Sequence, residues 1–251
     1  MAEEKKVALI TGSSGGIGAA LARSFAEKDY CVCINYLKSE QAAVELQEAI
    51  NAGCGVGTAL AIRADVGCRS DVIQMFEQVV ARFKRIDVLV NTAGLNIDKP
   101  FLEMTDGDWS MVLGTILTGT FICSQEFARR YLGEAGHIIT IGAVTALRGR
   151  KNGANYCSAR AGILTLTKCL ALELAPRIRV NCVTPGYINT AEVIERYHLD
   201  EQENLGRALS GIPMSRLGTP ADVFQIIDFI VNTSSYVTGQ NYFVDGGSYM
   251  H

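Results

Sequence analysis

The chain has 251 residues, with 23 Lys and Arg against 26 Asp and Glu, and a formal net charge of −3 at pH 7. The basic residues are scattered among acidic ones, so no surface suited to nucleic acid is expected. With 48% hydrophobic residues, a chain of this length can bury one substantial core, and we expect a single domain over residues 1–251.

The N-terminal residues contain no apolar leader, because MAEEKK leads directly into VALITG. No later apolar stretch is judged to reach about 18 residues, the length needed to cross a bilayer. The sequence therefore predicts a cytoplasmic protein without membrane contact.

Short β-branched runs alternate with longer segments of helical periodicity, which is typical of a parallel sheet with crossover helices. The pattern predicts a doubly wound α/β fold with seven strands and helices on both faces. The expected strands are Val7–Thr11, Cys31–Tyr36, Thr58–Ala64, Asp87–Asn91, His137–Ile141, Arg179–Thr184 and Asn241–Val244. The expected helices are Gly18–Lys28, Glu40–Asn51, Ser70–Phe83, Asp108–Leu132, Ala154–Leu174 and Pro220–Asn232. We interpret the polar segment Asn189–Ser215 as a mobile flap.

A glycine-rich turn, TGSSGGIG, follows the first predicted strand and opens a helix. Glycines at 12, 16 and 18 allow a tight turn and let the backbone approach a pyrophosphate, which the helix N-terminus attracts. A similar turn also serves ordinary strand-to-helix connections, so the turn alone is weak evidence for a nucleotide.

The cysteines and histidines indicate neither disulfides nor a metal. Eight cysteines lie mostly within apolar runs, and we expect reduced, buried thiols. The three histidines, His137, His198 and His251, do not show metal-ligand spacing with one another or with the cysteines.

Several motifs in order resemble the short-chain dehydrogenase/reductase family over essentially the whole chain. They are the glycine-rich turn, Asn91-Thr92-Ala93-Gly94 after the fourth strand, Tyr156 on the fifth helix and Pro185-Gly186 after the sixth strand. The segments HIITIGAVTAL, PGYINTAEV and VTGQNYFVDGG are most similar to 3-oxoacyl-carrier-protein reductases and their polyketide relatives. The resemblance implies a Rossmann-type domain that reduces a ketone or a 3-oxoacyl thioester.

The resemblance also implies cofactor contacts. Residues around the phosphates would be Gly12, Ser14, Gly16, Ile17 and Gly18. Asp65 and Val66 would edge the adenine, and Asn91, Ala93 and Gly94 would line the ribose. Pro185, Gly186, Ile188 and Thr190 would flank the nicotinamide.

No acid stands at the end of the second strand, in Asn35-Tyr36-Leu37-Lys38-Ser39. Because NAD enzymes place an acid there, Lys38 and Ser39 favour NADP, although Gly15 replaces an arginine common in NADPH-using relatives.

The family's catalytic tyrosine corresponds to Tyr156, but Arg160 stands where the resemblance predicts lysine. A phenol titrates near pH 10, so a neighbouring cation is needed to favour its phenolate. Arg160, one helical turn away, can supply that charge and donate to ribose hydroxyls, although a guanidinium cannot pass protons as an ammonium can. The alternative is an ordinary surface arginine on a helix.

Two further catalytic positions of the family are changed. Ala143 replaces a serine that would hydrogen-bond the substrate carbonyl, and Thr145 is a candidate substitute donor. Ile116 replaces an asparagine that would hold a water of the proton relay. Two hypotheses therefore stay open: an NADPH-dependent reductase with an atypical site, or an impaired homologue that acts as a nucleotide-binding or scaffold subunit of an active partner.

The resemblance implies a homotetramer, or a hetero-oligomer with a related reductase, joined through the two long helices and the C-terminal strand. The substrate would be a small or carrier-bound ketone held under the flap. Apolar and aromatic residues that we expect to line it are Tyr187, Val193, Ile194, Tyr197, Leu205 and Leu209.

Overall fold

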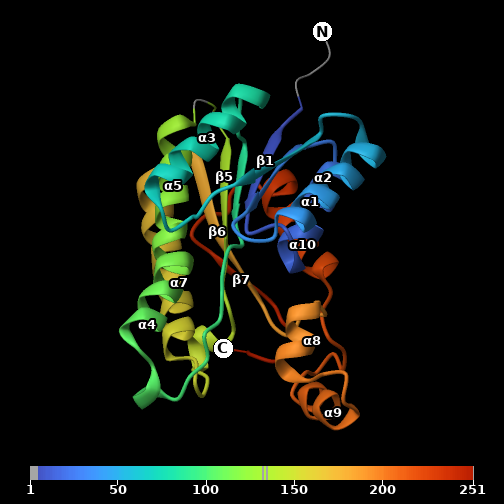
Figure 1. Cartoon of the computed structure of the whole chain (residues 1–251), viewed down its shortest axis with the longest axis vertical. Coiled ribbons are helices and arrows are strands. Elements are labelled where there is room, and N and C mark those ends of the chain that lie inside the picture. Colours follow the sequence, from blue (N-terminus) through green and yellow to red (C-terminus); the bar gives the residue numbers. More distant parts are fainter. Residues whose placement is uncertain (1–4, 132, 134, 251) are drawn as a thin grey trace.

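The computed structural model describes residues 5–131, 133 and 135–250. They form one parallel sheet of seven strands in the order β3-β2-β1-β4-β5-β6-β7 (Figure 1). The strands are β1 Val7–Thr11, β2 Cys31–Tyr36, β3 Ala59–Arg63, β4 Val88–Asn91, β5 Gly136–Ile141, β6 Ile178–Pro185 and β7 Asn241–Val244. The predicted doubly wound fold is confirmed, and no predicted strand boundary is wrong by more than one residue.

Helices cover both faces of the sheet. The α-helices are α1 Gly16–Glu27, α2 Glu40–Cys54, α3 Arg69–Phe83, α4 Asp106–Leu113, α5 Gly119–Arg130, α6 Thr145–Arg148, α7 Ala154–Leu174, α8 Ala191–Tyr197, α9 Gln202–Ser210 and α10 Pro220–Asp228. A short 3-10 helix, η1 Phe101–Glu103, precedes α4, and the π-helical segments η2 Gly114–Thr118 and η3 Phe229–Thr233 follow α4 and α10.

The core has two main layers because successive residues of a strand point to opposite faces. Ala8 and Ile10 of β1 pack with α1, α2 and α10, whereas Val7 and Leu9 pack with α3, α5 and α7. All five residues of β1 are buried, which explains why this strand reads as a continuous apolar run rather than an alternating one.

The predicted helix Asp108–Leu132 is interrupted. The chain forms α4, then η2, then α5, which ends at Arg130; Leu132 lies outside the described residues. The predicted helix Pro220–Asn232 similarly divides into α10 and η3. The chain stays helical through the π-helical segment, so one long apolar helical segment in the sequence does not reveal the change of helix type.

One expectation about apolar stretches was wrong. The continuous helical run Asp106–Arg130 is long and apolar enough to pass a test for membrane spans, with a mean hydropathy of 1.2. Half of that window is buried inside the protein, and Ile116, Cys123 and Phe127 are essentially inaccessible. The apolar character of this run is therefore used in the core of the fold.

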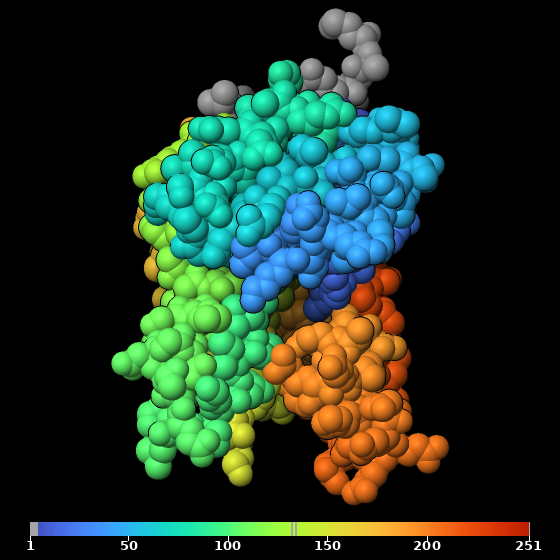
Figure 2. Space-filling view, viewed as in Figure 1, coloured from blue at the N-terminus to red at the C-terminus, as the bar shows by residue number. Residues whose placement is uncertain are grey.

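The segment predicted as a flap contains two helices, α8 and α9, that the sequence reading did not find. Thr190 caps α8 by accepting from Val193 N. Figure 2 shows this segment in orange facing the green region around α4, with a hollow between them. The flap and the α4 region thus form two walls of a cleft below the sheet.

The chain changes direction in the sheet between β1 and β4, which are adjacent although β2 and β3 intervene in sequence. Ligands of doubly wound sheets bind outside the carboxyl ends of the strands at such a switch point. Thr11 at the end of β1 ties the two strand ends together, since its Oγ1 accepts from the backbone N–H groups of Thr92 and Ala93, each at 3.1 Å.

Candidate active site

The glycine-rich turn leaves an open cradle at the N-terminus of α1. A Cβ at Gly12 would lie 2.6 Å from Ala93 Cα, and one at Gly18 would lie 2.8 Å from Gly12 O, so both glycines permit close backbone packing. Gly15 and Gly16 have nothing within 4 Å of an added Cβ. No side chain caps the helix, and its first turn contains no acid. The backbone around Gly15 and Gly16 is therefore open and uncapped at the N-terminus of α1, a position at which helices attract anions.

The residues expected at the ribose and adenine lie around this cradle. Asn91 does not point freely into the crevice, because its amide donates to Ser124 Oγ at 3.3 Å. Asp65 Oδ1 accepts from Gly67 N at 2.8 Å, and Val66 is buried. The side-chain oxygens and nitrogens named here are thus already engaged within the protein.

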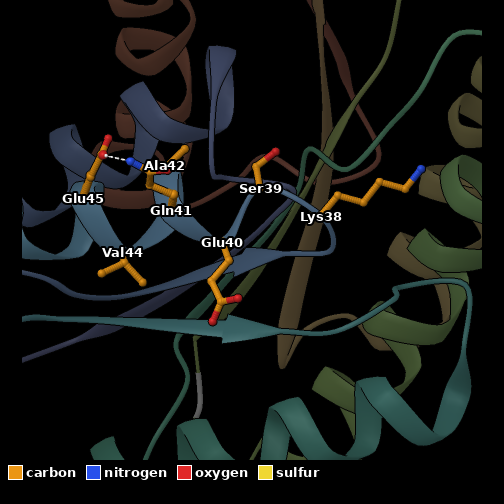
Figure 3. Close-up of a pocket in the computed structure, with 7 residues that line it drawn as sticks. All are labelled: Lys38, Ser39, Glu40, Gln41, Ala42, Val44 and Glu45. Carbon is orange, nitrogen blue, oxygen red and sulfur yellow. Dashed lines mark hydrogen bonds between the residues drawn. The ribbon is translucent and has the colours of Figure 1, made fainter.

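Lys38 and Ser39 line a surface hollow of about 710 Å³ at the start of α2 (Figure 3). Lys38 is exposed and extends away from Glu40 and the first turn of α2 in this view. Tyr36 is buried beneath it. Arg63, which the sequence reading did not single out, pairs with Tyr36 in the sheet register, and its Nε donates to Leu37 O at 3.2 Å. Two cations thus lie near the end of β2.

Tyr156 and Arg160 lie side by side on α7. The Arg160 guanidinium carbon is 5.3 Å from the Tyr156 ring centroid, and Arg160 is 6% exposed. Its Nη1 donates to Ile141 O at 2.6 Å, whereas its Nε has no partner among the described residues. The interpretation of Arg160 as an ordinary surface arginine is wrong, because the side chain is fixed beneath the strand end next to the phenol.

Asn155, a residue that the sequence reading also missed, fixes the beginning of α7. It is fully buried, and its amide donates to Ile97 O at 3.0 Å and to Asp108 O at 3.4 Å. The asparagine therefore joins the helix that carries Tyr156 to the loop after β4 and to α4. Its position directly before Tyr156 was the only signal in the sequence.

Ala143 and Thr145 lie shortly after the end of β5. Ala143 is buried and offers only a methyl group. Thr145 begins α6, and its hydroxyl is buried without a hydrogen-bond partner among the described residues. An unsatisfied buried hydroxyl is costly, so a polar ligand group that reached Thr145 Oγ1 would remove that cost.

Ile116 lies in the π-helical segment η2 and is fully buried. Its Cγ1 approaches the space in front of Gly94, where Arg160 Nη2 also lies. The Ile116 carbonyl accepts from Thr120 Oγ1 at 2.7 Å. Neither the side chain nor the engaged carbonyl of this residue readily holds a relay water.

The residues expected at the nicotinamide follow β6. Pro185 is the last residue of this strand, and an added Cβ at Gly186 would lie 2.8 Å from Asp245 Cα. Ile188 is buried and forms an isolated bridge with Gly218, while Thr190 caps α8. This segment connects the sheet directly to the flap.

Arg150 joins the loop after β4 to the flap, although the sequence reading did not identify it. Its Nη2 donates to Asp98 Oδ1 at 2.6 Å and to Asn96 Oδ1 at 3.1 Å, and its Nη1 donates to the Tyr197 hydroxyl at 3.2 Å. Its guanidinium carbon is 5.2 Å from the Tyr156 ring centroid. Burial lowers the pKa of Arg150, but Tyr197 and Asp98 raise it by more, so the group stays charged.

All eight cysteines are free. Cys33, Cys123 and Cys182 are buried, four others are partly buried and Cys169 is exposed, so the expectation of buried thiols holds for only part of the set. Within the described part of the chain, no group of three or more His, Cys, Asp or Glu side chains is arranged to hold a metal ion.

Comparisons with known proteins show the family to which the chain belongs. The crystal structure of a short-chain dehydrogenase/reductase of the glucose/ribitol dehydrogenase type from Brucella melitensis matches the chain with a TM-score of 0.88, 30% identity and 100% coverage of both chains. The family model described as enoyl-(acyl carrier protein) reductase matches residues 12–249. The chain belongs to the short-chain dehydrogenase/reductase family.

Within this family, the chain is similar to proteins named 3-oxoacyl-[acyl-carrier-protein] reductase. The protein of that name from Synechocystis is 38% identical over 249 residues, covering 98% of this chain and 97% of the relative. That from Staphylococcus aureus is 37% identical over 248 residues, covering 98% of each. This short-chain reductase is thus related to the 3-oxoacyl reductases along its whole length.

Proposed function

We propose that this chain uses NADPH to reduce a ketone, in particular the 3-oxo group of an acyl thioester of fatty-acid or polyketide type. The observation that carries the proposal is the buried Arg160 guanidinium held against the Tyr156 ring by its hydrogen bond to Ile141 O. The two relatives named for 3-oxoacyl reduction support the choice of substrate.

Tyr156 is the proton donor in this proposal. Its hydroxyl transfers a proton to the carbonyl oxygen as the carbonyl carbon becomes an alcohol carbon, and the permanently charged Arg160 stabilises the phenolate left behind. Thr145 Oγ1 is the substitute donor to the same carbonyl, because Ala143 has no hydrogen to donate. Arg160 keeps unused N–H groups that suit ribose hydroxyls, since only its Nη1 has a hydrogen-bond acceptor among the described residues.

The residues present fit a dinucleotide. The uncapped N-terminus of α1 and the open space at Gly15 and Gly16 suit its phosphates. When bound, the nicotinamide cofactor supplies the hydride. Lys38 and Arg63 near the end of β2 favour a 2′-phosphate and therefore NADPH over NADH.

The test is the steady-state oxidation of NADPH with an acetoacetyl thioester, comparing the native protein with Tyr156→Phe. We expect the phenylalanine variant to lose at least 10²-fold in kcat, as for removal of a general acid. An enoyl thioester assayed in parallel tests whether the protein reduces a carbon–carbon double bond instead of a carbonyl group. Equal background rates for both proteins would remove the reductase proposal.

The second candidate is a nucleotide-binding or scaffold subunit that stabilises an active, related partner. It is favoured by Ala143, by the buried Ile116 and by the engagement of the Ile116 carbonyl by Thr120. This candidate predicts that the protein binds NADPH without turnover and copurifies with a second reductase from its host. Nucleotide binding is measured by the fluorescence of NADPH.

The proposed assembly is a homotetramer, or a hetero-oligomer with such a partner, in the cytoplasm. Phe121 on α5 and Leu172 on α7 are 41% and 85% exposed, which leaves apolar surface on both helices expected at the interface. A native mass measurement tests this assembly, and a monomeric mass would contradict it.

A further inference from the structure

We propose that Arg150 is a specificity-determining residue that donates a hydrogen bond to the second carbonyl of the substrate, the one next to the carbonyl that is reduced. The inference rests on the proposed function and adds a residue that recognises the rest of a 3-oxoacyl group. A 3-oxoacyl thioester carries its thioester carbonyl one methylene away from its ketone, so a donor beside Tyr156 can reach the second group when the ketone meets the phenol.

Arg150 is held in a single place by acceptors from two other segments. Asn96 and Asp98 belong to the loop after β4, and Tyr197 ends α8 of the flap. The Tyr197 ring also packs edge-on against Tyr187, with centroids 5.1 Å apart. The Arg150 side chain is 15% exposed, so its guanidinium is positioned before any substrate arrives.

Arg150 has a hydrogen-bond donor left over. A guanidinium has five N–H groups, and the three bonds to Asp98, Asn96 and Tyr197 use both hydrogens on Nη2 and one on Nη1. Nε lies against Gly153, where an added Cβ would be 2.8 Å away, and has no partner among the described residues. The second N–H on Nη1 is therefore the donor available to a ligand.

The charges around Arg150 favour a neutral acceptor over a carboxylate. Asp98 pairs with Arg150 at 2.6 Å and with Arg196 at 3.3 Å, and Glu192 pairs with Arg196 at 2.7 Å. Two cations and two anions balance in this network, so a substrate carboxylate would add an uncompensated negative charge. A carbonyl oxygen accepts a charge-assisted hydrogen bond without that cost.

The experiment compares two classes of substrate. Arg150→Met removes the donors while keeping an unbranched apolar stem, and we expect kcat/KM for an acetoacetyl thioester to fall about ten-fold or more. For a cyclic monoketone such as 1-decalone, which lacks the second carbonyl, we expect a change of less than about two-fold, the size of a minor packing effect. The matched control is Arg196→Met, which disturbs the same Asp98 network but lies outside contact with Tyr156; it should affect both substrates equally.

A binding measurement completes the test without turnover. In the Tyr156→Phe background, adding Arg150→Met should weaken acetoacetyl thioester binding in calorimetry about ten-fold. Equal losses of kcat/KM on both substrates, or unchanged affinity in calorimetry, would overturn the role of Arg150. Absence of turnover by the native protein on any carbonyl would instead reject the proposed function, and the calorimetric result would still decide the inference.

Discussion

The guanidinium of Arg160 fills the space directly in front of Gly94: a Cβ on residue 94 would lie 2.6 Å from Arg160 Nη2. The φ angle of Gly94 is not in the left-handed region, so alanine fits the backbone there. The obstacle is the tip of a flexible side chain, which can move. The glycine therefore keeps room for the cation that accompanies Tyr156.

Gly94→Ala should lower activity while leaving stability nearly unchanged. The new methyl group pushes the guanidinium away from Ile141 O, so we expect kcat to fall about ten-fold, the scale of a lost charge-assisted hydrogen bond. Because the displaced atoms belong to a side-chain end, the free energy of unfolding should change by less than about 1 kcal/mol. Gly206→Ala is the matched control, since nothing lies within 4 Å of its added Cβ. A large loss of stability with unchanged kcat would contradict this role of Gly94.

Ala143→Ser should raise turnover. A serine hydroxyl after β5 would restore a donor to the substrate carbonyl, and such donors contribute on the order of 10² to 10³ in kcat. We expect at least a ten-fold rise in kcat, and a larger relative rise when Thr145→Val removes the unpartnered hydroxyl nearby. No rise in Ala143→Ser, together with a loss in Thr145→Val, would assign the donor role to Thr145 alone.

The sequence pattern predicted the strands of the sheet correctly because they are short β-branched runs that are buried on both faces. β1, β2 and β7 begin and end where the pattern predicts. Conversely, α8 and α9 were missed because they are short, with seven and nine residues, and neither contains a buried residue.

The neighbouring pair Tyr156 and Arg160 was predictable because the two residues lie one turn apart on a helix. Arg150 was not, because its partners Asn96, Asp98 and Tyr197 are 54, 52 and 47 residues away in the chain. Only the fold brings these segments together over the Tyr156 ring. Local spacing can reveal contacts within an element, but not contacts between the loops that form the cleft.

Lys38→Ala should reduce the preference for NADPH. If Lys38 contacts the 2′-phosphate as proposed, its removal should weaken NADPH binding about ten-fold and leave NADH binding nearly unchanged. The measurement is the dissociation constant of each nucleotide at low and at high salt, since screening should shrink the difference. Lys84→Ala, at the end of α3, serves as the control for loss of one positive charge. Equal weakening of both nucleotides would mean that Lys38 does not recognise a 2′-phosphate.

His137 on β5 should make stability depend on pH. Burial, followed by Arg179 and Lys6, lowers the pKa of His137 from 6.5 to about 4. The unfolded chain therefore binds the proton more readily than the folded chain between these values, so stability rises with pH in this window. The contribution is fully present above about pH 6.5, and as the pH falls towards 4 the free energy of unfolding should drop by up to about 3 kcal/mol.

His137→Leu tests this dependence because leucine removes the titrating ring while keeping the site apolar. Urea unfolding at several pH values should show a flatter profile between pH 4 and 6.5 than the native protein shows. His198→Asn, at the left-handed C-cap of α8, should keep the native profile, since asparagine tolerates that backbone conformation. The same slope in His137→Leu as in the native protein would place the titrating group elsewhere. Nδ1 of His137 has no hydrogen-bond partner among the described residues, so protonation would add a buried charge without a hydrogen bond at that atom, which agrees with the expected sign.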